Sequence, residues 1–148
     1  MGLIEKRLNE AADYALRGSH RSFYLGAMAL RKDGATVFAR NAFSTSPTPN
    51  AHAEFRLCRK LDVGSIVYVA RIIDSGWAMS KPCNSCMFQL KAFGVKKVYY
   101  TISPGEYGYI DVKSYIIETI AQGVRLPLFA VGRWNRGNVV DKISANIA

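Results

Sequence analysis

Four residues in the middle of the chain carry side chains that could hold a metal ion and move a proton. His52 and Glu54 stand two residues apart, and Cys83 and Cys86 form a C-x-x-C pair directly after Pro82. The cysteine pair begins 31 residues after His52. One imidazole and two thiolates suit zinc, and three protein ligands leave one tetrahedral position open. The spacing therefore indicates a catalytic zinc site with one ion per chain.

Glu54 is placed to act on a water molecule at that open position. If His52 opens a helix, Glu54 lies in the first turn of the same helix and can reach the open position. Zinc lowers the pKa of a bound water to about 7, so the carboxylate could take a proton from that water and return it to a leaving group. A C-x-x-C pair at the start of a second helix would bring both sulfurs together, and the helix N-terminus favours thiolate over thiol.

A closed structural zinc site or a redox pair of cysteines is the alternative interpretation. A closed site needs a fourth protein ligand. The remaining candidates are Cys58, which lies beyond Glu54 on the same predicted helix, and His20, which lies far upstream. Both are poorly placed for this role, so the pattern favours a catalytic site.

The whole pattern resembles a known motif. H-A-E at 52–54 followed by P-C-N-S-C at 82–86 is similar to the H-x-E…P-C-x-x-C motif of the zinc-dependent cytidine, deoxycytidylate and nucleic-acid deaminases. The resemblance implies a single domain over 1–148 with an α/β fold, in which three layers (α/β/α) contain a mixed five-stranded sheet. It also implies a hydrolase in which zinc is held by His52, Cys83 and Cys86, while Glu54 acts as both base and acid without binding the metal.

The resemblance further implies contacts with the substrate. The backbone N–H of Ala53 would hold the O2 atom of the base, and the backbone carbonyl of Ser80 or its neighbour would accept from the amino group. The segment 26–30 is similar to a G-A-V-x-V strand of the family, and Asn41 aligns with the family's substrate-binding Asn, whose amide can bind a sugar hydroxyl. A turn-stabilising side chain is the alternative for Asn41.

Two predicted loops offer additional contacts. The polar loop at 19–22 carries His20 and Arg21, and either side chain could bind a phosphate; a simple connector is the alternative. The loop at 103–109 is rich in Gly and Tyr. If it borders the pocket, Tyr107 or Tyr109 could stack on a base; a surface loop with partly buried tyrosines is the alternative.

The residues after Asn41 bear on the substrate. Free-cytidine deaminases carry a Glu two residues after this Asn, where the chain has Phe43, and its absence leaves room for a phosphate. The deoxycytidylate branch usually has Gly directly after the Asn, where the chain has Ala42. We predict a deaminase of a small pyrimidine nucleotide similar to dCMP, closest to the deoxycytidylate and tRNA-adenosine branches. The alternatives are a deaminase of a base within RNA or single-stranded DNA, and a non-catalytic zinc-binding module that holds nucleic acid.

Hydrophobic periodicity and turn residues predict the elements that position these residues. We expect helices at 2–17, 52–61, 83–93 and 112–121, and strands at 25–31, 36–43, 65–73, 95–102 and 126–131. The segment 74–79 looks inserted, with Trp77 packed in the core. A helix between the last two strands permits a parallel pair. In the resembled family a parallel pair goes with the deoxycytidylate and tRNA-adenosine branches, and an antiparallel pair with free-cytidine deaminases.

Composition sets broader limits. The chain has 148 residues, 49% of them hydrophobic, and a net charge of +9. This charge suits a phosphate-bearing partner, either a nucleotide or nucleic acid, although a solvated basic surface explains it equally well.

Three cysteines, two of them assigned to metal, favour a reducing compartment, hence a cytoplasmic location. We expect neither a signal peptide nor a membrane span. The resemblance implies a homo-oligomer, and the basic, aromatic tail after Gly132 could touch nucleic acid or cap the sheet.

Overall fold

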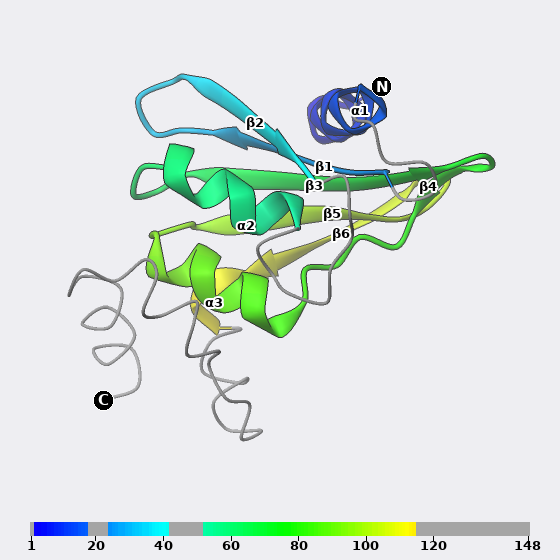
Figure 1. Ribbon diagram of the computed structural model, residues 1–148. Helices are drawn as coiled ribbons and strands as arrows, with labels where there is room; N and C mark the ends of the chain where they lie inside the picture. The colour runs from blue at the N-terminus through cyan, green and yellow to red at the C-terminus, as the bar shows by residue number, and fades with distance from the viewer. Residues whose placement is uncertain (1, 18–23, 42–51, 115–148) are drawn as a thin grey trace.

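A mixed β-sheet forms the centre of the molecule in the computed structural model, which describes residues 2–17, 24–41 and 52–114 (Figure 1). The strands follow the order β2-β1-β3-β5-β6, and β4 pairs with β3 beside this path. The elements in chain order are α1 (Leu3–Leu16), β1 (Tyr24–Leu30), β2 (Thr36–Arg40), α2 (Ala53–Leu57), the 3-10 helix η2 (Cys58–Lys60), β3 (Ile66–Ile73), β4 (Gly76–Ala78), α3 (Asn84–Ala92), β5 (Lys97–Ser103) and β6 (Glu106–Asp111).

The central strand β3 is a run of mostly β-branched and aromatic residues that is buried on both faces, as expected for an inner strand. It pairs antiparallel with β1, with Met28 opposite Tyr68, and parallel with β5, with Tyr68 opposite Tyr99. Because parallel neighbours need a crossover connection, the chain between β3 and β5 crosses through α3. This crossover returns the chain along the sheet and so fixes where α3 begins.

Helices cover both faces of the sheet. On one face α1 packs Leu8 and Ala11 against Met28 and Tyr68. The helix approaches closely because β1 carries a glycine there: a Cβ on Gly26 would lie 2.0 Å from the carbonyl oxygen of Ala11. On the other face lie α2 and α3 (Figure 1), whose apolar side chains pack against β3 and β5. The predicted three-layer α/β/α arrangement with a mixed sheet is confirmed.

The strand beside β5 differs from the prediction. The segment 103–109, expected as a loop, turns at Pro104-Gly105 and continues as β6, antiparallel to β5. Gly105 has a φ of 79°, which a residue without a Cβ adopts most readily. Between Lys97 and Tyr100 the strand β5 is paired with β3 on one side and β6 on the other. The strand expected at 126–131 lies outside the described residues, and the neighbour of β5 on this side that the structure describes is the antiparallel β6.

The segment that looked inserted forms a short hairpin. The turn at 74–75 reverses the chain, and β4 pairs with the end of β3, with Trp77 opposite Ile72. The Trp77 side chain packs in the core beneath α1, and its Nε1 donates a hydrogen bond to Asn9 Oδ1 at 3.0 Å. The predicted core position of Trp77 is confirmed. Among the residues described, no helix is long and apolar enough to cross a bilayer.

Candidate metal centre and adjoining pocket

Two helix N-termini meet at one end of the sheet and bring the predicted ligands together. His52 is the N-cap of α2, and Cys83 is the N-cap of α3. The Nδ1 atom of His52 lies 3.6 Å from the Sγ of Cys83 and 3.5 Å from the Sγ of Cys86. All three ligand atoms lie within 4.8 Å of one another.

These separations fit a tetrahedral zinc ion. With Zn–N near 2.05 Å and Zn–S near 2.3 Å, the tetrahedral angle gives an N···S distance of about 3.6 Å. The observed distances of 3.5 and 3.6 Å match this value. The two N···S separations are therefore those of a tetrahedral zinc site, and the three side chains could hold a zinc ion.

The protonation of the ligand atoms also fits a metal site. A hydrogen bond from Cys86, aided by the nearby His52, lowers the pKa of Cys83 to about 4. The hydrogen bond with Cys83 raises the pKa of His52, and burial raises the pKa of Cys86. In the absence of metal the cluster thus holds a thiolate at Cys83 beside a protonated imidazole. A thiolate is the form of cysteine that binds metal.

Glu54 lies beside this cluster with its carboxyl group enclosed. Its side chain is 2% exposed, and its Oε1 has no hydrogen-bond partner in the described part of the chain. Burial raises the pKa of Glu54 to about 7. A buried polar atom without a partner is costly, so a hydrogen-bonding group is expected opposite Oε1. A water molecule at the fourth position of a zinc ion would supply one.

Cys58 does not complete a closed metal site. Its thiol is buried in the core beneath α2 and donates a hydrogen bond to the backbone carbonyl of Glu54 at 3.4 Å. The metal-binding group found among the described residues contains His52, Cys83 and Cys86 alone. The other candidate for a fourth ligand, His20, lies outside the described residues.

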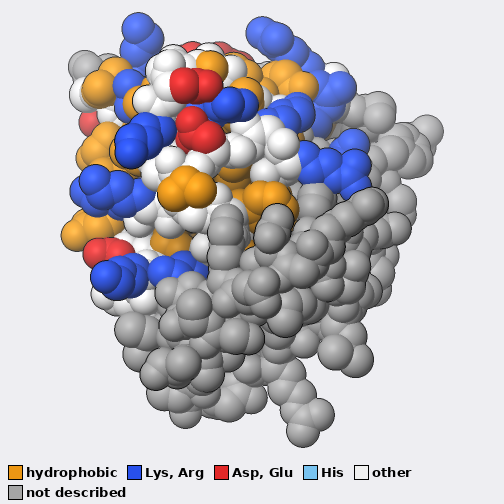
Figure 2. Space-filling view, turned by 90° about the vertical axis from the view of Figure 1, so that its left-hand side faces the viewer, with side chains coloured by type: hydrophobic (Ala, Val, Ile, Leu, Met, Phe, Trp, Pro, Cys, Tyr) orange, Lys and Arg blue, Asp and Glu red, His pale blue; other side chains and the backbone are white. Residues whose placement is uncertain are grey.

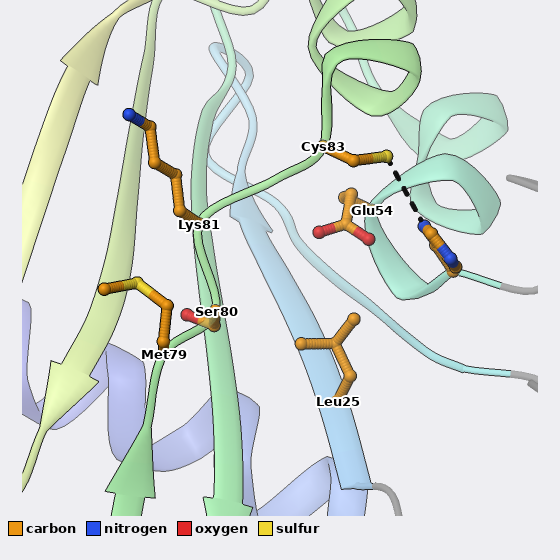
Figure 3. Close-up of a pocket in the computed structure, with 7 residues that line it drawn as sticks. Leu25, Glu54, Met79, Ser80, Lys81 and Cys83 are labelled. Carbon is orange, nitrogen blue, oxygen red and sulfur yellow. Dashed lines mark hydrogen bonds between the residues drawn. The ribbon is translucent and has the colours of Figure 1, made fainter.

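A cavity of about 130 Å³ opens beside the cluster (Figure 3). Its walls are Leu25, His52, Glu54, Met79, Ser80, Lys81 and Cys83. Ligand pockets for whole drug-sized molecules are larger, from about 300 Å³ upward. The cavity therefore has room for a small ring, and any attached groups would extend outward past its rim. Sequence reasoning missed Leu25, Met79 and Lys81; the position of Lys81 directly before P-C-x-x-C was the available signal.

Ser80 lies in the pocket wall and is held there by the sheet. Its hydroxyl donates to the carbonyl of Val69 at 3.0 Å, and its Oγ accepts from the backbone N–H of Thr101 at 2.8 Å. The backbone N–H of Ser80 donates to the carbonyl of Thr101 at 2.9 Å. These bonds engage the side chain fully and fix the backbone of residue 80 at the pocket. The substrate contact predicted for its carbonyl stays a prediction.

Asn41 has a structural role next to the pocket. Its Oδ1 accepts from the backbone N–H of Leu25 at 3.1 Å, and its own N–H donates to the carbonyl of Leu25 at 3.0 Å. Asn41 thereby joins the start of β1 to the residue after β2 and holds in place a residue that lines the cavity; the contact is not the turn-stabilising one that the alternative expected. The predicted contact of Asn41 with a sugar hydroxyl stays a prediction. The predicted contact of the Ala53 backbone N–H with the O2 atom of the base also stays a prediction; Ala53 is the buried first residue of α2. Arg21 lies outside the described residues.

Tyr107 and Tyr109 lie away from this pocket. Both belong to β6, and their rings contact the ring of Tyr99, which packs on the face of the sheet that α1 covers. The pocket lies on the other face, beside α2 and α3. Their positions therefore do not support the predicted stacking on a base in this cavity.

Comparison with known proteins supports the fold. No protein-family model and no curated protein matches the chain. Among solved structures, the chain is similar to the cytidine deaminase from Burkholderia pseudomallei, with a TM-score of 0.56 and 18% sequence identity, over 77% of this chain and 95% of that one. The similarity shows a cytidine-deaminase-like fold, in which a His/Cys/Cys group that could hold a metal lies at the N-termini of two helices.

Proposed function

We propose that this protein is a zinc-dependent hydrolase that removes the exocyclic amino group of a cytosine ring in a small nucleotide similar to dCMP, with release of ammonia. The observation that carries the proposal is the carboxyl group of Glu54, which is buried and unpaired at Oε1 beside three metal-ligand atoms. A structural zinc site has no need of such a group. A hydrolytic site needs one to move protons.

The ligands would be His52, Cys83 and Cys86, and zinc would supply Lewis-acid chemistry there by lowering the pKa of a water to about 7. Glu54 would take a proton from this water at Oε1 while the oxygen adds to C4 of the ring, and would pass the proton to ring atom N3. It would then deliver the second proton of the water to the amino group, which leaves as ammonia as the C4–O bond becomes a carbonyl. In the metal-free protein, burial raises the pKa of the Glu54 carboxyl group to about 7, and a carboxylate at this position has the chemistry of a general base and acid.

The nucleotide preference rests on one residue of the pocket wall and on two features of the sequence. Lys81 lines the cavity, and its side chain extends away from Glu54 and Cys83 (Figure 3), so its ammonium group could meet a phosphate only outside the space beside Glu54. Phe43 stands where the resembled free-cytidine deaminases have a ribose-binding Glu. The net charge of +9 also favours an anionic substrate.

One observation favours a second candidate, the free nucleosides cytidine and deoxycytidine. The strand β6 runs antiparallel to β5, and in the resembled family this arrangement goes with free-cytidine deaminases. It speaks against the deoxycytidylate and tRNA-adenosine branches. The Ala42 that replaces the usual Gly after Asn41 points the same way.

A substrate panel tests the proposal. The zinc-loaded full chain would be incubated with cytidine, deoxycytidine, dCMP and a cytosine-containing single strand, and ammonia release would be measured. We expect the highest kcat/KM with dCMP. If the protein converted only the nucleosides, the second candidate substrate would replace the nucleotide. If it converted only the single strand, both candidate substrates would be wrong. Absence of turnover with every substrate, in protein that carries stoichiometric zinc, would favour a non-catalytic zinc module.

A further inference from the structure

A second basic cavity lies at the opposite end of α3 from the metal ligands. Lys91, Lys96, Lys97 and Lys113 line this cavity of about 410 Å³, which we call the lysine groove. The helix α3 begins beside the pocket and ends at the groove, and its nine residues span about 14 Å. Figure 2 faces this end of the sheet and shows Lys and Arg side chains spread around the described surface, with some Asp and Glu side chains between them. The groove is thus separate from the candidate active site.

The positive charges of the groove are poorly balanced. Among the described residues that line the groove, Asp111 carries the one carboxyl group beside the four lysines. None of the four forms an ion pair within the described ranges, where the ion pairs join Arg31 to Asp33 and Asp62. Burial and the charge of Lys113 lower the pKa of Lys91. Because like charges held together repel each other, an anion in the groove would stabilise this arrangement.

Exposed aromatic rings adjoin the groove. The Nζ atom of Lys97 lies 5.9 Å from the centre of the Tyr109 ring. Tyr109 is 61% exposed and Tyr107 is 37% exposed. Both contact Tyr99, which stacks on Tyr68 with ring centres 5.2 Å apart and planes 10° apart. The two outer rings therefore rest against a packed pair, and the Tyr109 ring presents its surface next to Lys97.

We propose that the lysine groove and the Tyr109 ring form a binding site for single-stranded nucleic acid. Lysines spread along a groove suit successive phosphates of a backbone, and an exposed ring beside them suits an unpaired base, since every base has a face that can stack. The net charge of +9 and the pI of 9.7 agree with such a partner. An acidic peptide would use the lysines but would leave the ring surface without a matching group. The site goes beyond the proposed deamination, and it acts whether or not the bound strand is a substrate.

The test is direct binding, measured by fluorescence anisotropy. The zinc-loaded full chain would be titrated into a labelled single-stranded DNA of about 20 nucleotides, longer than one protein site of this kind usually covers. Lys97→Glu/Lys113→Glu should weaken binding about tenfold or more and should reduce the slope of log K against log salt by about 1.4, the value for two lost phosphate contacts on a single strand. Tyr109→Ala should weaken binding about fivefold or more, while Tyr109→Phe, which keeps the ring, should bind as the parent does.

Matched controls separate this site from general charge attraction. Lys6 and Arg17 are exposed residues on and beside α1, and Arg17 lines a surface pocket with Glu10 and Asp13. Lys6→Glu/Arg17→Glu changes the net charge as much as the groove double variant does, and we expect it to retain most of the binding. Equal weakening by both double variants, unchanged binding by Tyr109→Ala, or equally tight binding of a duplex of the same length would each overturn the proposal. Because binding is measured without turnover, failure here leaves the deamination proposal standing.

Discussion

The Nδ1 atom of His52 lies 3.5 Å from the Sγ of Cys86, although the two residues are 34 positions apart in the sequence. The contact exists because α2 and α3 begin at the same end of the sheet, each with a ligand residue as its N-cap. Glu54 lies in the first turn of α2 and is held against the same point. Two local helix starts on the same face of the sheet (Figure 1) therefore produce a three-ligand site with a carboxyl group beside it.

Zinc binding should release protons. Zinc requires a neutral imidazole and two thiolates, whereas the metal-free cluster holds a protonated His52 and a protonated Cys86 beside the Cys83 thiolate. At about pH 6, below the ordinary pKa of histidine, we expect one proton from His52 and one from Cys86 for each zinc bound. Titration calorimetry in two buffers of different ionisation enthalpy measures this number.

The Glu54→Gln variant is the suitable background for that measurement, because it removes the proton that Glu54 itself could lose near pH 7. The affinity for zinc should rise with pH until the ligands are deprotonated. Release of no protons at pH 6 would mean that the three side chains do not bind the metal together.

Glu54→Gln should separate metal binding from catalysis. The amide keeps the size of the side chain but cannot act as a base, so kcat should fall by about 10²- to 10⁴-fold. Zinc content should remain stoichiometric because Glu54 is not among the ligands. The melting temperature should not fall, since the exchange removes an ionisable group that is buried with an unpaired oxygen. Retained ammonia release by this variant would refute the acid–base role.

Much of the site could be predicted from the sequence because its chemistry restricts the residue types. One His and two Cys are a ligand set that leaves zinc one open position, and their order with the nearby Glu resembles one known motif. The ligands also stand at helix starts, which local sequence marks. The prediction therefore identified the cluster without knowledge of the register of the sheet.

The strand β6 could not be recognised in the same way. The stretch Ser103 to Tyr109 contains the Pro-Gly turn and a further Gly, and its composition is that of a loop. It becomes a strand because β5 offers an open edge, which is a tertiary effect that propensity does not report. The face on which Tyr107 and Tyr109 lie then follows from their register with Thr101 and Tyr99. Cytoplasmic location and homo-oligomeric state stay predictions.

Lys81→Met should distinguish nucleotide from nucleoside substrates. Methionine keeps part of the apolar stem and removes the ammonium group at the rim of the pocket. If this group binds a phosphate, KM for dCMP should rise about fivefold to tenfold, the effect of losing one partly exposed charged hydrogen bond. KM for deoxycytidine and kcat for both substrates should stay near the parent values. A similar rise in KM for both substrates would assign Lys81 to the shape of the pocket and not to phosphate recognition.

Asp62 should make the stability of the fold depend on pH. Its carboxylate accepts from the backbone N–H of Lys32 at 2.9 Å and of Asp33 at 3.2 Å, and from the hydroxyl of Ser65 at 2.7 Å. The N–H of Lys32 is the largest cause that lowers the pKa of Asp62 below its ordinary value. A carboxyl group whose pKa is lower in the folded state than in the unfolded state stabilises the folded protein at pH values above its unfolded pKa, which is near 4. This stabilisation is lost as the pH falls through the pKa of the folded state.

Asp62→Asn should therefore lower the free energy of unfolding at neutral pH, and the difference from the parent should shrink as the pH falls below about 4. Urea unfolding of both proteins at a series of pH values measures this difference. The ionic strength should be held constant, because Asp62 is largely solvated and salt would screen its attraction to the nearby Arg31. Asp74→Asn is a matched control, since Asp74 lies in the exposed turn between β3 and β4. A difference between Asp62→Asn and the parent that is the same at every pH would show that Asp62 acts through its shape and not through its charge.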